Sequence, residues 1–95
     1  MSVSVNVRLP SSLRPLAGNQ EVVAVAGSTV GEVLTNLTAK YDGIAGKIFP
    51  QPGKLGKWVN VFVNGEDIRF LSDQATELKG GEEISIVPAV AGGRD

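Results

Sequence analysis

The sequence predicts an α+β domain in which a mixed sheet of about five strands packs on one main helix. Residues 3–9 alternate between apolar and polar side chains, which is typical of half-buried strands. At residues 59–64, three valines alternate with Asn60, Phe62 and Asn64, which indicates another strand. Residues 29–41 carry apolar side chains at helical spacing. A chain of 95 residues can form one domain with a modest core and no deep cleft.

The N-terminal part of the chain predicts a β-hairpin. The first strand ends at Pro10, and residues 15–19 (Pro-Leu-Ala-Gly-Asn) have the composition of a turn. A second apolar run follows at residues 21–25 and is interrupted by Gly27. These two strands are expected to pair.

The main helix has both a start and a stop signal. Thr29 and Glu32 have the spacing of a capping box, in which each side chain satisfies a backbone N–H at the first turn. Asp42-Gly43 is expected to end the helix, with Gly43 in a left-handed cap. The apolar residues of the expected helix form one stripe along it, with spacing i, i+3, i+4, i+7 and i+11. They are Val30, Val33, Leu34, Leu37 and Tyr41.

The second half of the chain predicts a loop and then strands. Residues 44–57 contain several prolines and glycines, so we expect a long irregular loop, in which one short helical turn could form. Asn64-Gly65 is a strong tight-turn signal after the alternating strand. Residues 68–70 are expected to form a short strand, and Gly80-Gly81 a turn before the last strand at residues 83–87.

The order of these elements is strand, strand, helix, strand, strand, strand. Such elements bury their apolar faces in two layers, with the helix against one face of the sheet. One helix is too few for a doubly wound parallel sheet. The simplest topology is the β-grasp, in which the first and last strands are parallel and central.

Composition excludes most catalytic chemistry. The chain has no cysteine and no histidine, so it has no disulfide, no Cys/His zinc site, no thiol nucleophile and no imidazole base. The carboxylate pairs Glu66-Asp67 and Glu82-Glu83 do not converge, because adjacent residues in a strand point to opposite faces. We interpret both pairs as solvated surface or turn residues and Lys79 as a turn cap. The chain is therefore expected not to be an enzyme by itself and to bind no cofactor or metal.

Charge and hydropathy bear on partners and location. The formal net charge of −1 argues against a nucleic-acid partner, since such proteins usually carry a basic excess. The chain contains no apolar stretch of the ~18 residues that a membrane span needs. Its first eight residues alternate and do not resemble a signal peptide. These observations favour a cytoplasmic protein without a membrane partner.

The C-terminus is the sharpest functional signal. Residues 1–88 are expected to form the domain, and residues 89–95 a flexible tail that carries Gly92-Gly93. Glycine has no side chain, so such a tail is thin enough for a narrow channel, and residues 88–93 would reach roughly 20 Å when extended. The tail is suited to deliver a carboxylate into a partner's active site. A frayed terminus would have a similar composition.

Fold and tail together resemble the ThiS/MoaD family of ubiquitin-like sulfur carriers over nearly the whole chain. Within this family the chain is similar to the actinobacterial carriers for cysteine biosynthesis, in Gly53-Lys54-Leu55, Asp67-Ile68-Arg69-Phe70, Ala75-Thr76 and residues 88–93. The pieces that match the family as a whole are Leu13-Arg14-Pro15, residues 28–33 (STVGEV), residues 61–67 (VFVNGED) and residues 86–93 (IVPAVAGG).

The resemblance implies a mechanism carried by the tail. A ubiquitin-activating-type adenylating enzyme would use ATP to adenylate the Gly93 carboxylate, and a sulfur donor would then leave a Gly93 thiocarboxylate. Ala91, Gly92 and Gly93 would enter the partner's channel. A biosynthetic enzyme would take the sulfur for cysteine, thiamin, molybdopterin or a secondary metabolite. Alternatives are a ubiquitin-like modifier, a passive interaction module and a small regulatory subunit.

The C-terminus differs from the family pattern, because the active form of these carriers ends at the second glycine. Arg94-Asp95 follow Gly93, so the Gly93 carboxyl group is held in a peptide bond and cannot be adenylated. Either a peptidase trims these two residues from a natural precursor, or they were added to the natural chain. The first interpretation is preferred.

A docking surface is predicted on the sheet. If Val59, Val61 and Val63 face the helix, Phe62 lies on the open face, with Val87 as its neighbour across the sheet. An exposed apolar patch of this kind often marks an interface. Arg8 and Arg14 are expected to flank the patch and to attract a carboxylate. The alternative is that the loop at residues 44–57 covers Phe62.

Overall fold

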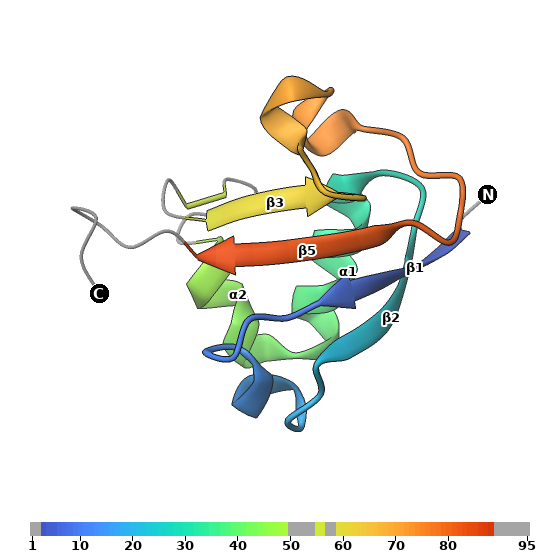
Figure 1. Cartoon of the computed structure of the whole chain (residues 1–95). Helices are drawn as coiled ribbons and strands as arrows, with labels where there is room; N and C mark the ends of the chain where they lie inside the picture. Colours follow the sequence, from blue (N-terminus) through green and yellow to red (C-terminus); the bar gives the residue numbers. More distant parts are fainter. Residues whose placement is uncertain (1–2, 50–54, 57–58, 89–95) are drawn as a thin grey trace.

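A computed structural model describes residues 3–49, 55–56 and 59–88 and has the predicted β-grasp topology (Figure 1). The sheet has five strands in the order β2-β1-β5-β3-β4. The two central strands β1 and β5 are parallel, and the other neighbours are antiparallel. The strands are β1 (Val3–Arg8), β2 (Val22–Gly27), β3 (Val59–Val63), β4 (Glu66–Asp67) and β5 (Glu83–Pro88).

The main helix, α1 (Val30–Lys40), begins at the predicted position. Thr29 is its N-cap, and the Thr29 hydroxyl accepts a hydrogen bond from the Glu32 N–H at 3.2 Å. The Glu32 carboxylate bonds to the backbone N–H and the hydroxyl of Ser28, one residue earlier than in the standard capping box. The apolar stripe of α1 is buried against the sheet.

A second helix, α2 (Asp42–Ile48), occupies the start of the predicted irregular loop, so the prediction was wrong at residues 44–48. Gly43 lies inside this helix and not in a left-handed cap. The chain turns at Tyr41, whose backbone is extended, and then becomes helical again because Ile44 and Ile48 are both buried at i, i+4 spacing. In the part of the chain that the structure describes, no helix is both long and apolar enough to span a bilayer.

The segment after β4 also differs from the prediction. Ile68–Phe70 is a 3-10 helix, η2, and not a strand. The Asp67 carboxylate accepts a hydrogen bond from the Arg69 N–H at 2.9 Å, and this cap favours a tight helical turn over an extended strand. The predicted Asn64-Gly65 turn is confirmed by positive φ angles of 51° and 86°. The other 3-10 helices are η1 (Arg14–Ala17) and η3 (Asp73–Ala75).

The core lies between one face of the sheet and the two helices (Figure 1). Alternation along the strands places Val5, Val7, Val61 and Ile84 in this core, as predicted. The intervening residues therefore point to the opposite face, which α1 and α2 do not cover. This open face and the end of β5 are the parts of the fold from which a site can be built.

Candidate functional site

The tail begins at the end of the central strand β5. Pro88, the last residue of β5, pairs with Val59 at the start of β3. Because β1 and β5 are parallel, their C-terminal ends lie at the same end of the sheet (Figure 1). The predicted tail residues Ala91, Gly92 and Gly93 and the extension Arg94-Asp95 lie outside the described residues.

Phe62 and Val87 both point to the open face of the sheet. Phe62 is half-buried and Val87 is 44% exposed, and neither belongs to the core cluster. The two residues are diagonal neighbours and do not pair directly, since Phe62 pairs with Ser85 and Val87 with Asn60. The described part of the 44–57 segment packs on the other face through α2. Docking at Phe62 and Val87 stays a prediction.

The two arginines that were expected to flank this patch are engaged by the chain's own groups. Arg8 bridges two exposed carboxylates, because its guanidinium pairs with Glu21 and with Glu83, the latter at 3.0 Å. The hydrogen bond and charge of Glu83 raise the pKa of Arg8 further above its ordinary value. Arg14 donates from Nε to the Leu9 carbonyl at 3.1 Å. A partner's carboxylate would have to compete with these contacts at either arginine.

A buried carboxylate that pairs with an exposed arginine at the edge of the open face was not predicted. Asp67 is only 8% exposed and pairs with Phe62 across β3 and β4, so it is not the solvated residue that the sequence suggested. Arg69 covers it, with Nη2 2.7 Å from Asp67 Oδ2, and the same Nη2 donates to Asn60 Oδ1 at 3.1 Å. The neighbouring Phe70 is 81% exposed. The one signal in the sequence was the family motif Asp67-Ile68-Arg69-Phe70. The alternation of apolar and polar residues does not indicate that Asp67 and Arg69 form a pair.

The turn before β5 is held by Glu82. Its carboxylate accepts hydrogen bonds from the backbone N–H groups of Lys79 at 2.8 Å and Gly80 at 2.7 Å. These bonds lower the pKa of Glu82. The prediction that the Lys79 side chain caps this turn is wrong. Glu82 is the capping side chain, and Lys79 contributes only its backbone N–H as a donor. Gly80 and Gly81 both have positive φ angles, which explains the Gly-Gly pair.

We expect stability to fall in acid and Asp67→Asn to reduce this fall. The hydrogen bond from Arg69 lowers the pKa of Asp67, so the folded state binds this proton less readily than the unfolded state does. Stability from the pair is therefore present above the unfolded pKa and is lost as pH falls below about 4. Urea unfolding at pH 7 and pH 3 measures the difference. Glu66→Gln, at the exposed neighbouring residue, is the control, and an unchanged pH dependence in Asp67→Asn would contradict the argument.

Fold and tail define a class of protein, the small ubiquitin-like carriers. The chain matches the ThiS family over residues 7–93 and belongs to that family. It is 43% identical over 93 residues to the sulfur carrier protein CysO of Mycobacterium tuberculosis, covering 96% of this chain and 100% of the relative. The relatives that this match brings together are small carrier proteins and not enzymes.

Two further relatives show the range of this class. The chain is 34% identical to small archaeal modifier protein 3 of Haloferax volcanii, covering 96% of this chain and 100% of that protein. In the crystal structure of the Amycolatopsis orientalis BexX/CysO complex, the matching chain has a TM-score of 0.84 and 37% identity, with coverage of 94% of this chain and 99% of that one. This likeness confirms the β-grasp fold.

In the described ranges, no group of three or more acidic residues is placed to hold a metal ion.

Proposed function

We propose that this chain carries sulfur as a thiocarboxylate on Gly93. The observation that supports the proposal is that the match to the ThiS family runs to residue 93 and ends there. Residue 93 is the second glycine of the Gly92-Gly93 pair, which follows the domain by a short tail. Family membership and the position of the tail both support Gly93 as the residue that carries the sulfur.

The proposed chemistry has two steps, both on a partner enzyme. The Gly93 carboxylate attacks the α-phosphate of ATP, which forms an acyl adenylate and releases pyrophosphate. A sulfide equivalent then attacks the acyl carbon and displaces AMP, which leaves the thiocarboxylate. Adenylation is needed because a free carboxylate is a poor electrophile. The chain has no cysteine or histidine side chain that would react with the activated carbonyl.

Arg94 and Asp95 must leave before the first step. While they are attached, the Gly93 carbonyl belongs to a peptide bond and has no free oxygen anion to attack ATP. A peptidase that cleaves after Gly93 would release the carboxylate. It would also shorten the tail by roughly 7 Å of extended chain and remove a bulky charged pair.

The sulfur is then passed to a biosynthetic enzyme. Similarity to the CysO carriers supports cysteine biosynthesis as the pathway, although a carrier tail can serve other acceptors by the same chemistry. By analogy with the complex of a relative with BexX, we propose that the acceptor binds the folded domain as well as the tail. The second candidate function is protein modification, favoured by the identity to an archaeal modifier protein. In that case a lysine amine would attack the same adenylate.

Mass spectrometry of the chain ending at Gly93 and of the 95-residue chain tests the proposal. Each is incubated with a ubiquitin-activating-type enzyme, ATP and sulfide. The shorter chain is expected to gain the mass of one oxygen replaced by one sulfur, and the longer chain to stay unchanged. The same gain on an intact chain ending in Asp95 would contradict the requirement for a free Gly93 carboxylate. Transfer to a lysine without thiocarboxylate would favour the modifier.

We expect Phe62→Asp and Val87→Asp to weaken binding to the activating enzyme by about tenfold or more, which is the loss typical of an interface hot spot. A carboxylate introduced into a desolvated contact is unpaired and costly to bury. Titration calorimetry measures the binding, and thermal melting checks the fold. Ser4→Asp, on the exposed part of β1, is the control. If Phe62→Asp unfolds the chain, Phe62 contributes to the core and its assignment to docking is wrong.

A further inference from the structure

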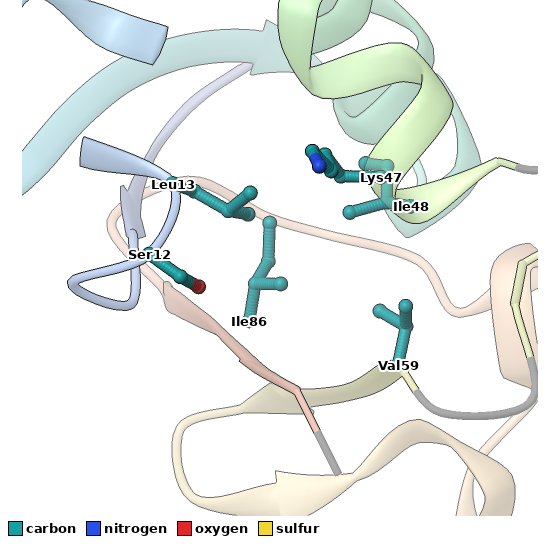
Figure 2. A pocket seen from close by; sticks show the side chains of 6 residues that line it. All are labelled: Ser12, Leu13, Lys47, Ile48, Val59 and Ile86. Atoms are coloured by element: carbon teal, nitrogen blue, oxygen red, sulfur yellow. The ribbon is translucent and has the colours of Figure 1, made fainter. Parts of the chain in front are cut away.

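A small cavity opens at the end of the sheet from which the tail leaves. Its volume is about 130 Å³. Figure 2 shows the segments around it: the turn after β1, the end of α2, and the neighbouring strands β3 and β5. Ser12 and Lys47 are exposed, so the cavity reaches the surface between them. The lining residues are Ser12, Leu13, Lys47, Ile48, Val59 and Ile86.

The size and the lining of the cavity restrict what can occupy it. Small-molecule sites usually measure about 300–1,000 Å³, so this cavity is too small for a nucleotide or a comparable cofactor. It is large enough for one side chain. Leu13, Ile48 and Ile86 are buried apolar walls, and Ser12 and Lys47 are the polar residues among the six that line the cavity. The occupant is therefore an apolar side chain, and an acidic group beside it would complement Lys47.

The position of the cavity relates it to the tail. Ile86 lies two residues before Pro88, and Val59 pairs with Pro88. From residue 89 to residue 93 the tail spans at most ~17 Å, at ~3.3 Å per residue. An enzyme that receives Gly93 in its active site must therefore come close to the end of β5. Its surface would then lie over the mouth of the cavity.

We propose that this cavity is the pocket into which the activating enzyme inserts one apolar side chain, with an acidic residue of that enzyme beside Lys47. The inference rests on the proposed function, because it assumes that an enzyme receives the tail. The pocket and the tail would form one continuous interface. A buried apolar anchor at the centre of such an interface typically supplies much of the binding energy. Here it would also fix the direction in which the tail enters the partner.

Two substitutions that differ by one position provide the test. Ser12→Leu fills the mouth of the cavity from an exposed residue, and Ser11→Leu places the same side chain at an exposed neighbour outside the lining. The probe is the activating enzyme that thiocarboxylates the chain ending at Gly93. Ser12→Leu is expected to weaken binding about tenfold, as the loss of one anchor contact does, and Ser11→Leu to leave it unchanged. Equal affinity of the two variants would overturn the proposal.

Charge reversal tests the acidic neighbour. Lys47→Glu is expected to weaken binding about tenfold and to reverse its salt dependence, because an attraction becomes a repulsion. Lys40→Glu, at the exposed end of α1, is the matched control. If both variants bind alike, no acidic group of the enzyme lies at Lys47.

Methyl NMR distinguishes the enzyme from the chain's own tail as the occupant. The methyl groups of Ile48 and Ile86 are expected to shift when the enzyme binds, and in the free chain ending at Gly93 to show no nuclear Overhauser effect to residues 89–93. Such an effect would place the tail in the cavity and overturn the proposal. If Ser12→Leu is thiocarboxylated and bound normally, only the pocket proposal fails. If the unsubstituted chain ending at Gly93 gains no sulfur, the proposed function fails.

Discussion

Gly92→Val is expected to lower the yield of thiocarboxylate about a hundredfold, which is the loss that a misplacement of the reacting group by about 1 Å can cause. Glycine at this position lets the backbone approach the walls of a channel, and a branched side chain would prevent this approach. Valine also restricts the backbone angles that the tail can adopt in the channel. The measurement is mass spectrometry of the chain ending at Gly93 after incubation with the activating enzyme, ATP and sulfide.

Two controls separate an effect on the tail from an effect on folding. The melting temperature of Gly92→Val should equal that of the unsubstituted chain, because residue 92 follows the last strand, which ends at Pro88. Ala89→Val introduces the same side chain nearer the domain and is expected to leave the yield within about threefold, since it changes a residue farther from the reacting carboxylate. An undiminished yield from Gly92→Val would mean that the tail does not enter a narrow channel.

Gly27→Ala is expected to destabilise the fold by about 3 kcal/mol, near the upper end of the range for overpacking a core. Gly27 is the last residue of β2 and lies against the first turns of α1. A Cβ at this position would be 2.6 Å from Val33 Cγ2 and 2.8 Å from the Val33 backbone nitrogen. The backbone atom cannot move unless the helix shifts, so the clash is not relieved by a rotamer change.

Gly46→Ala is the matched control and should have the opposite sign. Gly46 lies within α2, and a Cβ there would meet nothing within 4 Å. Alanine in a helix interior is more favourable than glycine by roughly 0.5–1 kcal/mol, so this variant should be slightly more stable. Urea unfolding of both variants gives the two free energies. If Gly27→Ala is as stable as Gly46→Ala, then β2 and α1 are not packed as closely as described.

Much of the fold could be predicted because its signals are local. Period-two alternation identified β1 and β3, and the helical stripe after Thr29 identified α1. The Asn64-Gly65 pair identified the hairpin turn through its backbone preference. The order of these elements was then enough to predict that β1 and β5 are parallel and central. The tail was also read from the chain alone, since Gly92-Gly93 and the family resemblance need no coordinates.

Other features depend on contacts between segments that are distant in the sequence. Ile44 and Ile48 make residues 42–48 helical only because the core accepts them, and a short Gly-rich segment gives no such signal by itself. Asp67 is covered at the edge of the open face by Arg69, whose guanidinium is also held by Asn60. The sequence alone indicated a solvated carboxylate, because it shows no partner for Asp67.

The sequence by itself determined the family, the β-grasp order and the carboxyl group that is expected to carry sulfur. The tertiary structure alone decided how Phe62 and Val87 are offset across the sheet. It also decided which groups form ion pairs or hydrogen bonds with Arg8 and Arg14. It also assembled the cavity, whose lining residues run from position 12 to position 86. The physical reason is that register and cavities arise from packing between elements, whereas periodicity and turn preferences are properties of neighbouring residues.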